Sequence, residues 1–173
     1  MRHAEGSIVM LCVNCYAHEL NEVPVENYVY NECGLFNVVL RDMTVRACPF
    51  CDCRHVAVPN ELALKDTIAR ELSVKMGRLT GSEVDYLFRY TGYHEIDIAE
   101  MIDRKASTVK GWRHGNIRMT EDDEMRFRLV MLQRFKIKGC NVVAATMSRK
   151  KPSVMYFRMN AKREWIRLLA RQD

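Results

Sequence analysis

The spacing of apolar residues changes near residue 60. Before it, the stretches "VPVENYVYNE" and "LFNVVLRDMTVRA" are rich in β-branched and aromatic residues, and Gly34 between them is a turn signal. After it, apolar residues recur every three or four positions, which is typical of amphipathic helices. We therefore predict a small antiparallel sheet followed by a helical region.

The first predicted helix begins after Asn60, which is a candidate cap, and it places Leu64, Ile68 and Leu72 on one face. We expect this apolar stripe to pack on a neighbouring domain. The stretch "GRLTGSE" then breaks the helical spacing. We place a hinge near Gly77.

A second helix follows this hinge, with Thr80 or Ser82 as its cap and Gly92 as its end. Two shorter helices come next. The first covers about residues 94–102, and the second carries Val109 and Trp112 inward. Two short helices joined by a brief turn are typical of a helix-turn-helix, a motif that places its second helix in the major groove of DNA.

With Val109 and Trp112 buried, the residues on or near the opposite face of this helix are the candidates for DNA contact. Residues 103–118 contain five basic side chains and one acidic side chain, so we expect a basic surface. A small helical bundle that does not bind DNA is the alternative. The predicted DNA-binding residues are Lys105, Ala106, Ser107, Thr108, Lys110, Gly111, Arg113 and His114.

A further helix is predicted in "TEDDEMRFRLVMLQRFK", where Thr120 caps a first turn with four acidic residues. Leu129, Leu132 and Phe135 give it an apolar face. Beyond it, "NVVAATM" and "VMYFRMN" predict two strands, and "AKREWIRLLARQ" predicts a terminal helix that covers their hairpin. This last region either stabilises a dimer or contacts phosphate or a partner through the basic stretch "SRKKPS".

These elements predict an α+β protein with four parts. Residues 1–60 form a zinc-clipped antiparallel β domain, and residues 61–77 form a connecting helix and hinge. Residues 78–135 form an all-α helix-turn-helix domain, and residues 136–173 form a basic strand–helix extension. We expect the first and third parts to have separate cores.

The cysteines explain how so short a β region could fold. "CVNC" and "CPFC" each bring two thiolates together through a tight turn, so Cys12, Cys15, Cys48 and Cys51 supply the four sulfurs of one structural zinc site. Metal binding would then be part of folding. A thioredoxin-like redox pair would need a surrounding βαβ pattern, which is not visible.

Other residues compete for the metal. Cys53 is the strongest competitor because it lies two residues past Cys51, but C-x2-C is the commoner spacing. We interpret Cys33, Cys53, His18 and His55 as packing or surface residues.

Charge and composition narrow the function. The net charge is +5, but residues 1–60 have four Lys and Arg against seven Asp and Glu, whereas residues 134–173 have eleven against two. The basic end suits a polyanion such as nucleic acid, or is simply a solvated face. Seven cysteines and no apparent signal peptide or long apolar run favour a soluble, cytoplasmic protein with reduced thiols.

An enzyme is not expected. Four sulfur ligands leave no open metal position for an activated water, and neither a Gly-rich phosphate loop nor a nucleophile motif is visible. The five histidines are scattered among different predicted elements.

Taken together, the two cysteine pairs, the strand-rich interval between them and "LTGSEVDYLFRYTGYHEIDIAEMIDRKASTVKGWRHG" resemble the MqsA family of antitoxins. That family joins a YgiT-type zinc finger to a phage-repressor-type (Cro/cI-like) helix-turn-helix. The resemblance covers about residues 10–135. Three features depart from it: Arg104 replaces an apolar turn residue, Arg113 replaces an acidic residue, and residues 136–173 have no counterpart in the short antitoxins.

The resemblance implies a homodimeric repressor that binds double-stranded DNA at a palindromic operator. It also implies a toxin partner bound by the zinc domain. Two alternatives stay open: a stand-alone regulator of a phage or mobile element, and a protein-interaction adaptor that does not bind DNA.

Overall fold

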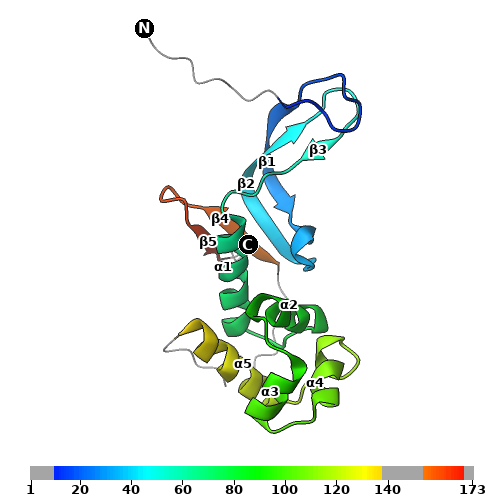
Figure 1. The fold of residues 1–173 in the computed structure, drawn as a ribbon. Helices are drawn as coiled ribbons and strands as arrows, with labels where there is room; N and C mark the ends of the chain where they lie inside the picture. Colours follow the sequence, from blue (N-terminus) through cyan, green and yellow to red (C-terminus); the bar gives the residue numbers. More distant parts are fainter. Residues whose placement is uncertain (1–9, 138–153, 170–173) are drawn as a thin grey trace.

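The structure is a computed structural model, and it describes residues 10–137 and 154–169. Over these ranges the chain is α+β, with five α-helices and one five-stranded mixed sheet. Figure 1 shows an elongated molecule in which the sheet lies at one end, the other four helices lie at the other, and α1 (Glu61–Val74) runs between them. None of the described helices combines the length and apolarity that a membrane span requires.

The predicted pair of strands is confirmed. β1 (Asn21–Val29) and β2 (Val38–Ala47) run antiparallel, and a 3-10 turn at Asn31–Cys33 connects them. The turn ends at Gly34 with φ of +80°, a left-handed conformation that glycine adopts without steric cost. β3 (Arg54–His55) pairs with the last residues of β2.

The sheet is larger than predicted because the C-terminal part of the chain joins it. β4 (Met155–Met159) pairs with β2 in parallel, and β5 (Trp165–Leu168) returns antiparallel to β4. The predicted terminal helix is therefore wrong where the structure describes it, since residues 165–168 form a strand. The other predicted strand, "NVVAATM", lies outside the described residues.

A left-handed residue in the middle of β2 changes which of its side chains face inward. Asp42 has φ of +55°. Before it, the buried side chains include Val38 and Leu40; after it, they are Met43 and Val45. The pairing with β4 stops at Leu40, and Met43 is the last residue of β2 in the main core, so the end of β2 beyond Met43 is the part that reaches the cysteine loops.

Four further helices form the other end of the molecule. Thr80 caps α2, its hydroxyl accepting a hydrogen bond from the backbone N–H of Glu83, and Thr120 caps α5 in the same way. Asn60 occupies the N-cap position of α1 as predicted, but with φ of +49° it makes no side-chain capping bond. The helices are α2 (Gly81–Thr91), α3 (Glu95–Ile102), α4 (Ala106–Arg113) and α5 (Glu121–Phe135).

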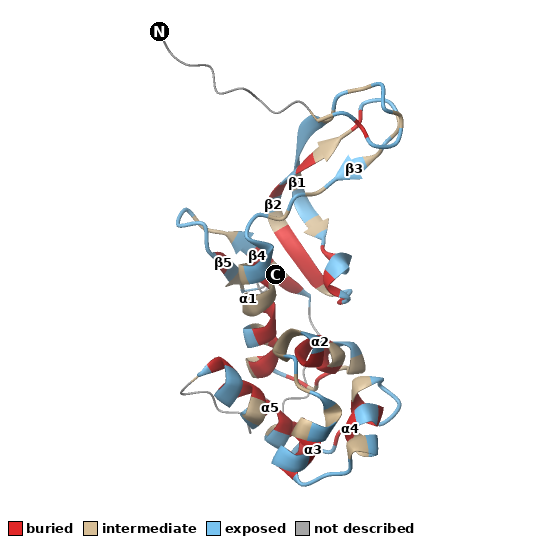
Figure 2. Cartoon of the chain, in the orientation of Figure 1, coloured by how far each residue is buried: buried red, intermediate tan, exposed pale blue. Residues whose placement is uncertain are grey.

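One apolar core joins the sheet to the helices, so the prediction of separate cores is wrong. It runs from Leu40 and Phe157 in the sheet through Leu64 in α1 to Phe88 in α2. Figure 2 shows buried segments in β2, in α1 and in the helices at the other end of the molecule. Trp165 of β5 helps to close this core, and its indole N–H donates to the carbonyl oxygen of Pro59 at 2.9 Å.

The predicted hinge is a fixed connection in the structure. The guanidinium group of Arg128, fully buried in α5, donates to the carbonyl oxygens of Ser73, Lys75 and Gly77. Lys75 in turn binds both carboxylate oxygens of buried Glu83, at 2.7 and 2.6 Å. Because the backbone of this linker is bonded to α5, α1 and α2 are held at one relative orientation.

Candidate metal centre and candidate nucleic-acid interface

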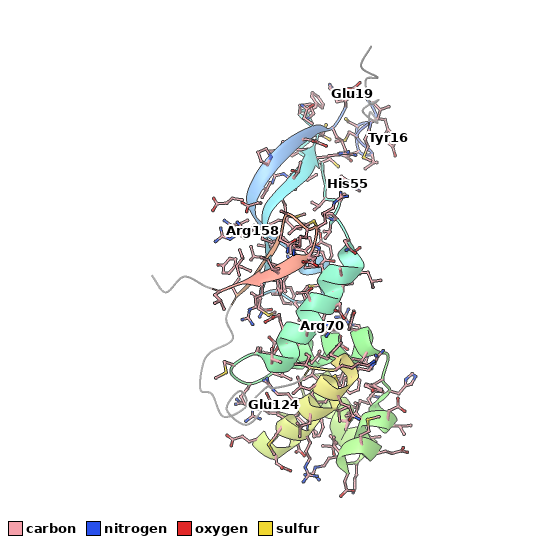
Figure 3. All side chains as sticks on the ribbon, turned by 90° about the vertical axis from the view of Figure 1, so that its left-hand side faces the viewer. Tyr16, Glu19, His55, Arg70, Glu124 and Arg158 are labelled. Atoms are coloured by element: carbon pink, nitrogen blue, oxygen red, sulfur yellow. The ribbon has the colours of Figure 1, made fainter. Side chains whose placement is uncertain are left out.

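The two cysteine pairs lie in loops at the far end of the sheet, and in each loop the N–H of the first cysteine closes the loop with a backbone hydrogen bond. In the first loop, the N–H of Cys12 donates to the carbonyl oxygen of His18 at 2.8 Å; in the second, the N–H of Cys48 donates to that of Cys53 at 2.8 Å. Figure 3 shows the neighbouring Tyr16 and Glu19 at this end of the molecule, with His55 lower down, toward α1.

The four predicted ligands come together. All four sulfur atoms of Cys12, Cys15, Cys48 and Cys51 lie within 4.8 Å of one another. The Cys12–Cys51 and Cys15–Cys48 sulfur distances are 3.4 and 3.8 Å. Tetrahedral zinc with Zn–S bonds of about 2.3 Å requires sulfurs about 3.8 Å apart. These four residues could therefore hold one metal ion.

The thiols of the cluster differ in acidity. Hydrogen bonding from the backbone of Ala17, together with the His18 ring, lowers the pKa of Cys15 to about 6. Burial raises the pKa of Cys48 to about 11. A metal ion binds thiolate, so it would have to displace the proton of Cys48, whereas Cys15 is already largely ionised at neutral pH.

The competing ligands lie outside the cluster. Cys33 is buried and donates to the carbonyl oxygen of Tyr30 at 3.1 Å, which is a packing role. His18 stacks on Phe50 at a ring distance of 4.8 Å, with Nδ1 3.6 Å from the sulfur of Cys15. In the part of the chain that the structure describes, no further cysteine or histidine belongs to the sulfur cluster.

At the other end of the molecule, α3 and α4 are joined by a short turn. Asp103 ends α3 with φ of +57°, and its N–H bonds to the carbonyl oxygens of Ala99 and Glu100. α4 begins three residues later and buries Val109 and Trp112, as predicted. The opposite side of α4 therefore faces solvent.

The solvent-exposed face of α4 is narrower than predicted. Ser107, Lys110 and His114 are exposed, and they follow one another at intervals of three and four residues. Lys105 is exposed just before the helix. Among the described residues, neither Lys105 nor Lys110 makes an ion pair. Ala106 and Thr108 are half-buried at the edges of this face.

Two of the predicted DNA-binding residues lie elsewhere. Gly111 is buried, and a Cβ built on it would lie 2.5 Å from Cδ1 of Ile117, so it is a packing residue. Arg113 lies four residues from Val109, on nearly the same side of the helix, and it forms ion pairs with Asp85 and Glu95 at 2.8 Å each.

Arg104 also forms an ion pair within the protein. Its Nε donates to Asp123 in the first turn of α5 at 2.6 Å. Sequence reasoning explained this acidic turn by the helix dipole and missed the ion pair across to the α3–α4 turn. Arg118 is the opposite case: it is exposed and makes no ion pair with any described residue. In the sequence, only its position in the basic stretch indicated that it could contact DNA.

Comparison with protein-family models, curated proteins and solved structures gave no match for this chain.

Proposed function

We propose that the protein is a sequence-specific DNA-binding regulator in which α3 and α4 act as a helix-turn-helix. One observation carries this proposal: α4 buries Val109 and Trp112 and presents Ser107, Lys110 and His114 on its exposed face. These side chains offer the donors and acceptors that read base edges and bind phosphate. Lys105 and Arg118 flank them with positive charge.

The regulator acts as a homodimer on a palindromic operator, because a single short recognition helix reads too few bases for a specific site. Leu129 on α5 supports this assembly. It is 51% exposed, whereas the neighbouring apolar residues Leu132 and Phe135 are buried within the chain. An antitoxin that represses its own operon is the form of this function that the MqsA resemblance suggests.

The cysteine cluster holds one structural zinc ion. Sulfur distances of 3.4 and 3.8 Å fit tetrahedral coordination, and four protein ligands leave no position for a reacting water. Its role is to fix the two loops at the end of the sheet rather than to catalyse a reaction.

A second candidate function is protein binding at the cysteine loops. Four large apolar side chains gather in these loops and are more than half exposed: Leu11, Val13, Tyr16 and Phe50. Exposed apolar residues of this kind are typical of protein-binding surfaces. A toxin would dock here, and an adaptor without DNA binding would use this surface alone.

Selection from a random pool of DNA duplexes, followed by titration at several salt concentrations, tests the proposed function. We expect one preferred sequence with two-fold symmetry. Lys110→Ala should weaken binding and reduce the slope of log affinity against log salt by about one if Lys110 holds a phosphate. Lys162→Ala, in the exposed β4–β5 turn, is the matched control and should bind as wild type does. Failure to select any sequence would leave the adaptor function.

A further inference from the structure

The last basic residue of α4 connects three helices. Nε of Arg113 donates to Oδ1 of Asp85 in α2, and a terminal nitrogen donates to Oε1 of Glu95 in α3, both at 2.8 Å. The guanidinium carbon also lies 5.3 Å from the centroid of the Phe88 ring. We call Asp85, Arg113 and Glu95 the α4 clamp.

The three side chains of the clamp are partly shielded from solvent and carry full charges. The Arg113 side chain is 24% exposed, and those of Asp85 and Glu95 are 33% and 26% exposed. Burial alone would raise the pKa of Asp85, but hydrogen bonds from Arg113 and Arg89 lower it below its ordinary value. Both carboxylates are therefore ionised at neutral pH, and the clamp is fully charged.

Directional contacts matter for α4 because the helix has only eight residues. Val109 and Trp112 fix its depth through apolar packing, which tolerates small rotations. A planar guanidinium group bound to two carboxylates from different helices restricts the angle as well. At the opposite end, Arg104 binds Asp123 of α5, so α4 is restrained at both ends.

We propose that Arg113 is a positioning residue: through the α4 clamp it sets the rotation of α4, and thereby the aim of Ser107, Lys110 and His114, without touching DNA. This inference rests on the proposed function. From its positive charge alone, Arg113 would be counted as a phosphate contact. The proposal instead gives it a part in distinguishing one DNA sequence from another. Loss of the clamp should reduce the discrimination between the preferred DNA sequence and others, while the number of phosphates bound by the protein stays the same.

The test compares wild type, Arg113→Gln and Glu95→Gln for binding to the selected site and to an unrelated duplex. Melting curves define a temperature at which every variant is folded, and binding is measured there. Glu95→Gln removes the negative charge from one arm of the clamp and leaves the charge of Arg113 in place. We expect both variants to lower the ratio of specific to non-specific affinity by about tenfold, the scale of one misplaced base contact, with an unchanged salt slope.

Other outcomes would contradict either the positioning role of Arg113 or the proposed function. A salt slope reduced by about one in Arg113→Gln alone, with the affinity ratio intact, would make Arg113 a phosphate contact. A lower melting temperature with wild-type affinity ratios in both variants would make the clamp purely structural. If wild type itself shows no sequence preference, the proposed function is wrong and this inference is wrong with it. If wild type prefers one DNA sequence and both variants keep that preference, the positioning role of the clamp is wrong and the proposed function stands.

Discussion

Gly81, the first residue of α2, lies against the loop that follows α4. A Cβ built on it would lie 2.6 Å from Cα of Gly115 and 2.9 Å from its backbone nitrogen. Backbone atoms cannot swing aside as the end of a side chain can. Gly115 is itself held at φ of +72°, which other residues adopt at a steric cost. The two glycines therefore allow α2 and the exit of α4 to approach closely.

Gly81→Ala should destabilise the protein by about 1–3 kcal/mol, because the methyl group must displace backbone. This sign is opposite to helix propensity, which favours alanine over glycine by about 1 kcal/mol. Urea unfolding measures the difference. Ser82→Ala, at the next and exposed position, should change stability by no more than about 0.5 kcal/mol. A stabilised Gly81→Ala protein would show that the contact with Gly115 is not maintained.

Arg128 and Arg126 illustrate how burial decides the value of an ion pair. Both are paired four residues back along α5, Arg128 with Glu124 and Arg126 with Asp122. Arg128 is fully buried and also binds three carbonyl oxygens, one at the end of α1 and two in the α1–α2 linker, whereas Arg126 is 46% exposed. Removing Arg128 leaves unpaired polar groups in the core, whereas removing Arg126 does not.

Arg128→Met should cost about 3–5 kcal/mol of folding free energy, since it leaves the carbonyl oxygens of Ser73, Lys75 and Gly77 without their donor and removes one of the two arginines that bind buried Glu124. Arg126→Met is the matched control on the same helix and should cost about 0.5 kcal/mol or less. Denaturant unfolding of both variants, followed by far-UV circular dichroism, measures these costs. Similar losses in the two variants would contradict the role given to the buried guanidinium group.

Among the structural elements, the cysteine loops form a unit that contributes little to the main core. Neither Cys12 nor Cys48 belongs to the continuous core that joins the sheet and helices, although both are buried. The boundary lies just after Met43, which is the last residue of β2 in the continuous core, and the part of β2 beyond it leads to the loops. A metal ion would thus stabilise its own end of the sheet.

Removing the metal should unfold residues 10–23 and 44–57 and spare the five helices. Hydrogen exchange with and without a chelator measures this, with loss of protection in those two segments only. Metal analysis should give about one zinc per chain in wild type and none in Cys48→Ser. Loss of protection throughout α1 to α5 would show that the main core depends on the metal.

The α4 clamp gives the helical end a defined dependence on pH. Against the effect of burial, hydrogen bonds from Arg113 and Arg89 lower the pKa of Asp85, and the backbone N–H of Glu95 together with Arg113 lowers the pKa of Glu95. The stability that these carboxylates contribute is therefore present above the ordinary carboxyl pKa values, near 4, and is lost as the pH falls from there through the lowered values. Arg113→Gln should therefore lose less stability than wild type between about pH 5 and pH 3. Urea unfolding across this range tests it, with Arg126→Gln as the control; parallel curves for wild type and Arg113→Gln would contradict it.

Across the whole molecule, the C-terminal hairpin makes one body of parts that the sequence presents as separate. β4 extends the sheet beside β2, and β5 packs on α1. Arg167 of β5 binds Glu71 of α1 at 2.8 Å, and Trp165 is buried at the same junction. The hairpin thus ties the sheet to the helix that leads to the proposed DNA-binding end.

Trp165→Ala should destabilise the sheet and the helices together, by about 3–5 kcal/mol, because it opens a cavity in the shared core. Thermal unfolding followed by near-UV and far-UV signals should still show a single coincident transition at lower temperature. Ile166→Ala, which is 38% exposed at the next position, should cost much less. Two separated transitions in wild type would mean that sheet and helices unfold independently.

The extent to which sequence predicts this structure depends on how local each signal is. The cysteine pairs, the Thr80 cap and the burial of Val109 and Trp112 follow from spacing over a few residues, and they were predicted. The pairing of β4 with β2 joins residues more than a hundred positions apart, and no local pattern encodes it. The role of Arg113 was missed because a basic residue on a short helix has the same pattern whether it binds DNA or two carboxylates.

The parallel pairing of β2 with β4 also has a consequence for synthesis. A chain emerging from the ribosome makes β2 early, but the strand that covers its second edge comes only after all five helices have been translated. Until residue 157 is available, Val38, Val39 and Leu40 keep backbone groups open to pairing with another chain. Nascent chains stalled between residues 137 and 154 should therefore be the most prone to associate with one another, and release of the full-length chain should end that exposure.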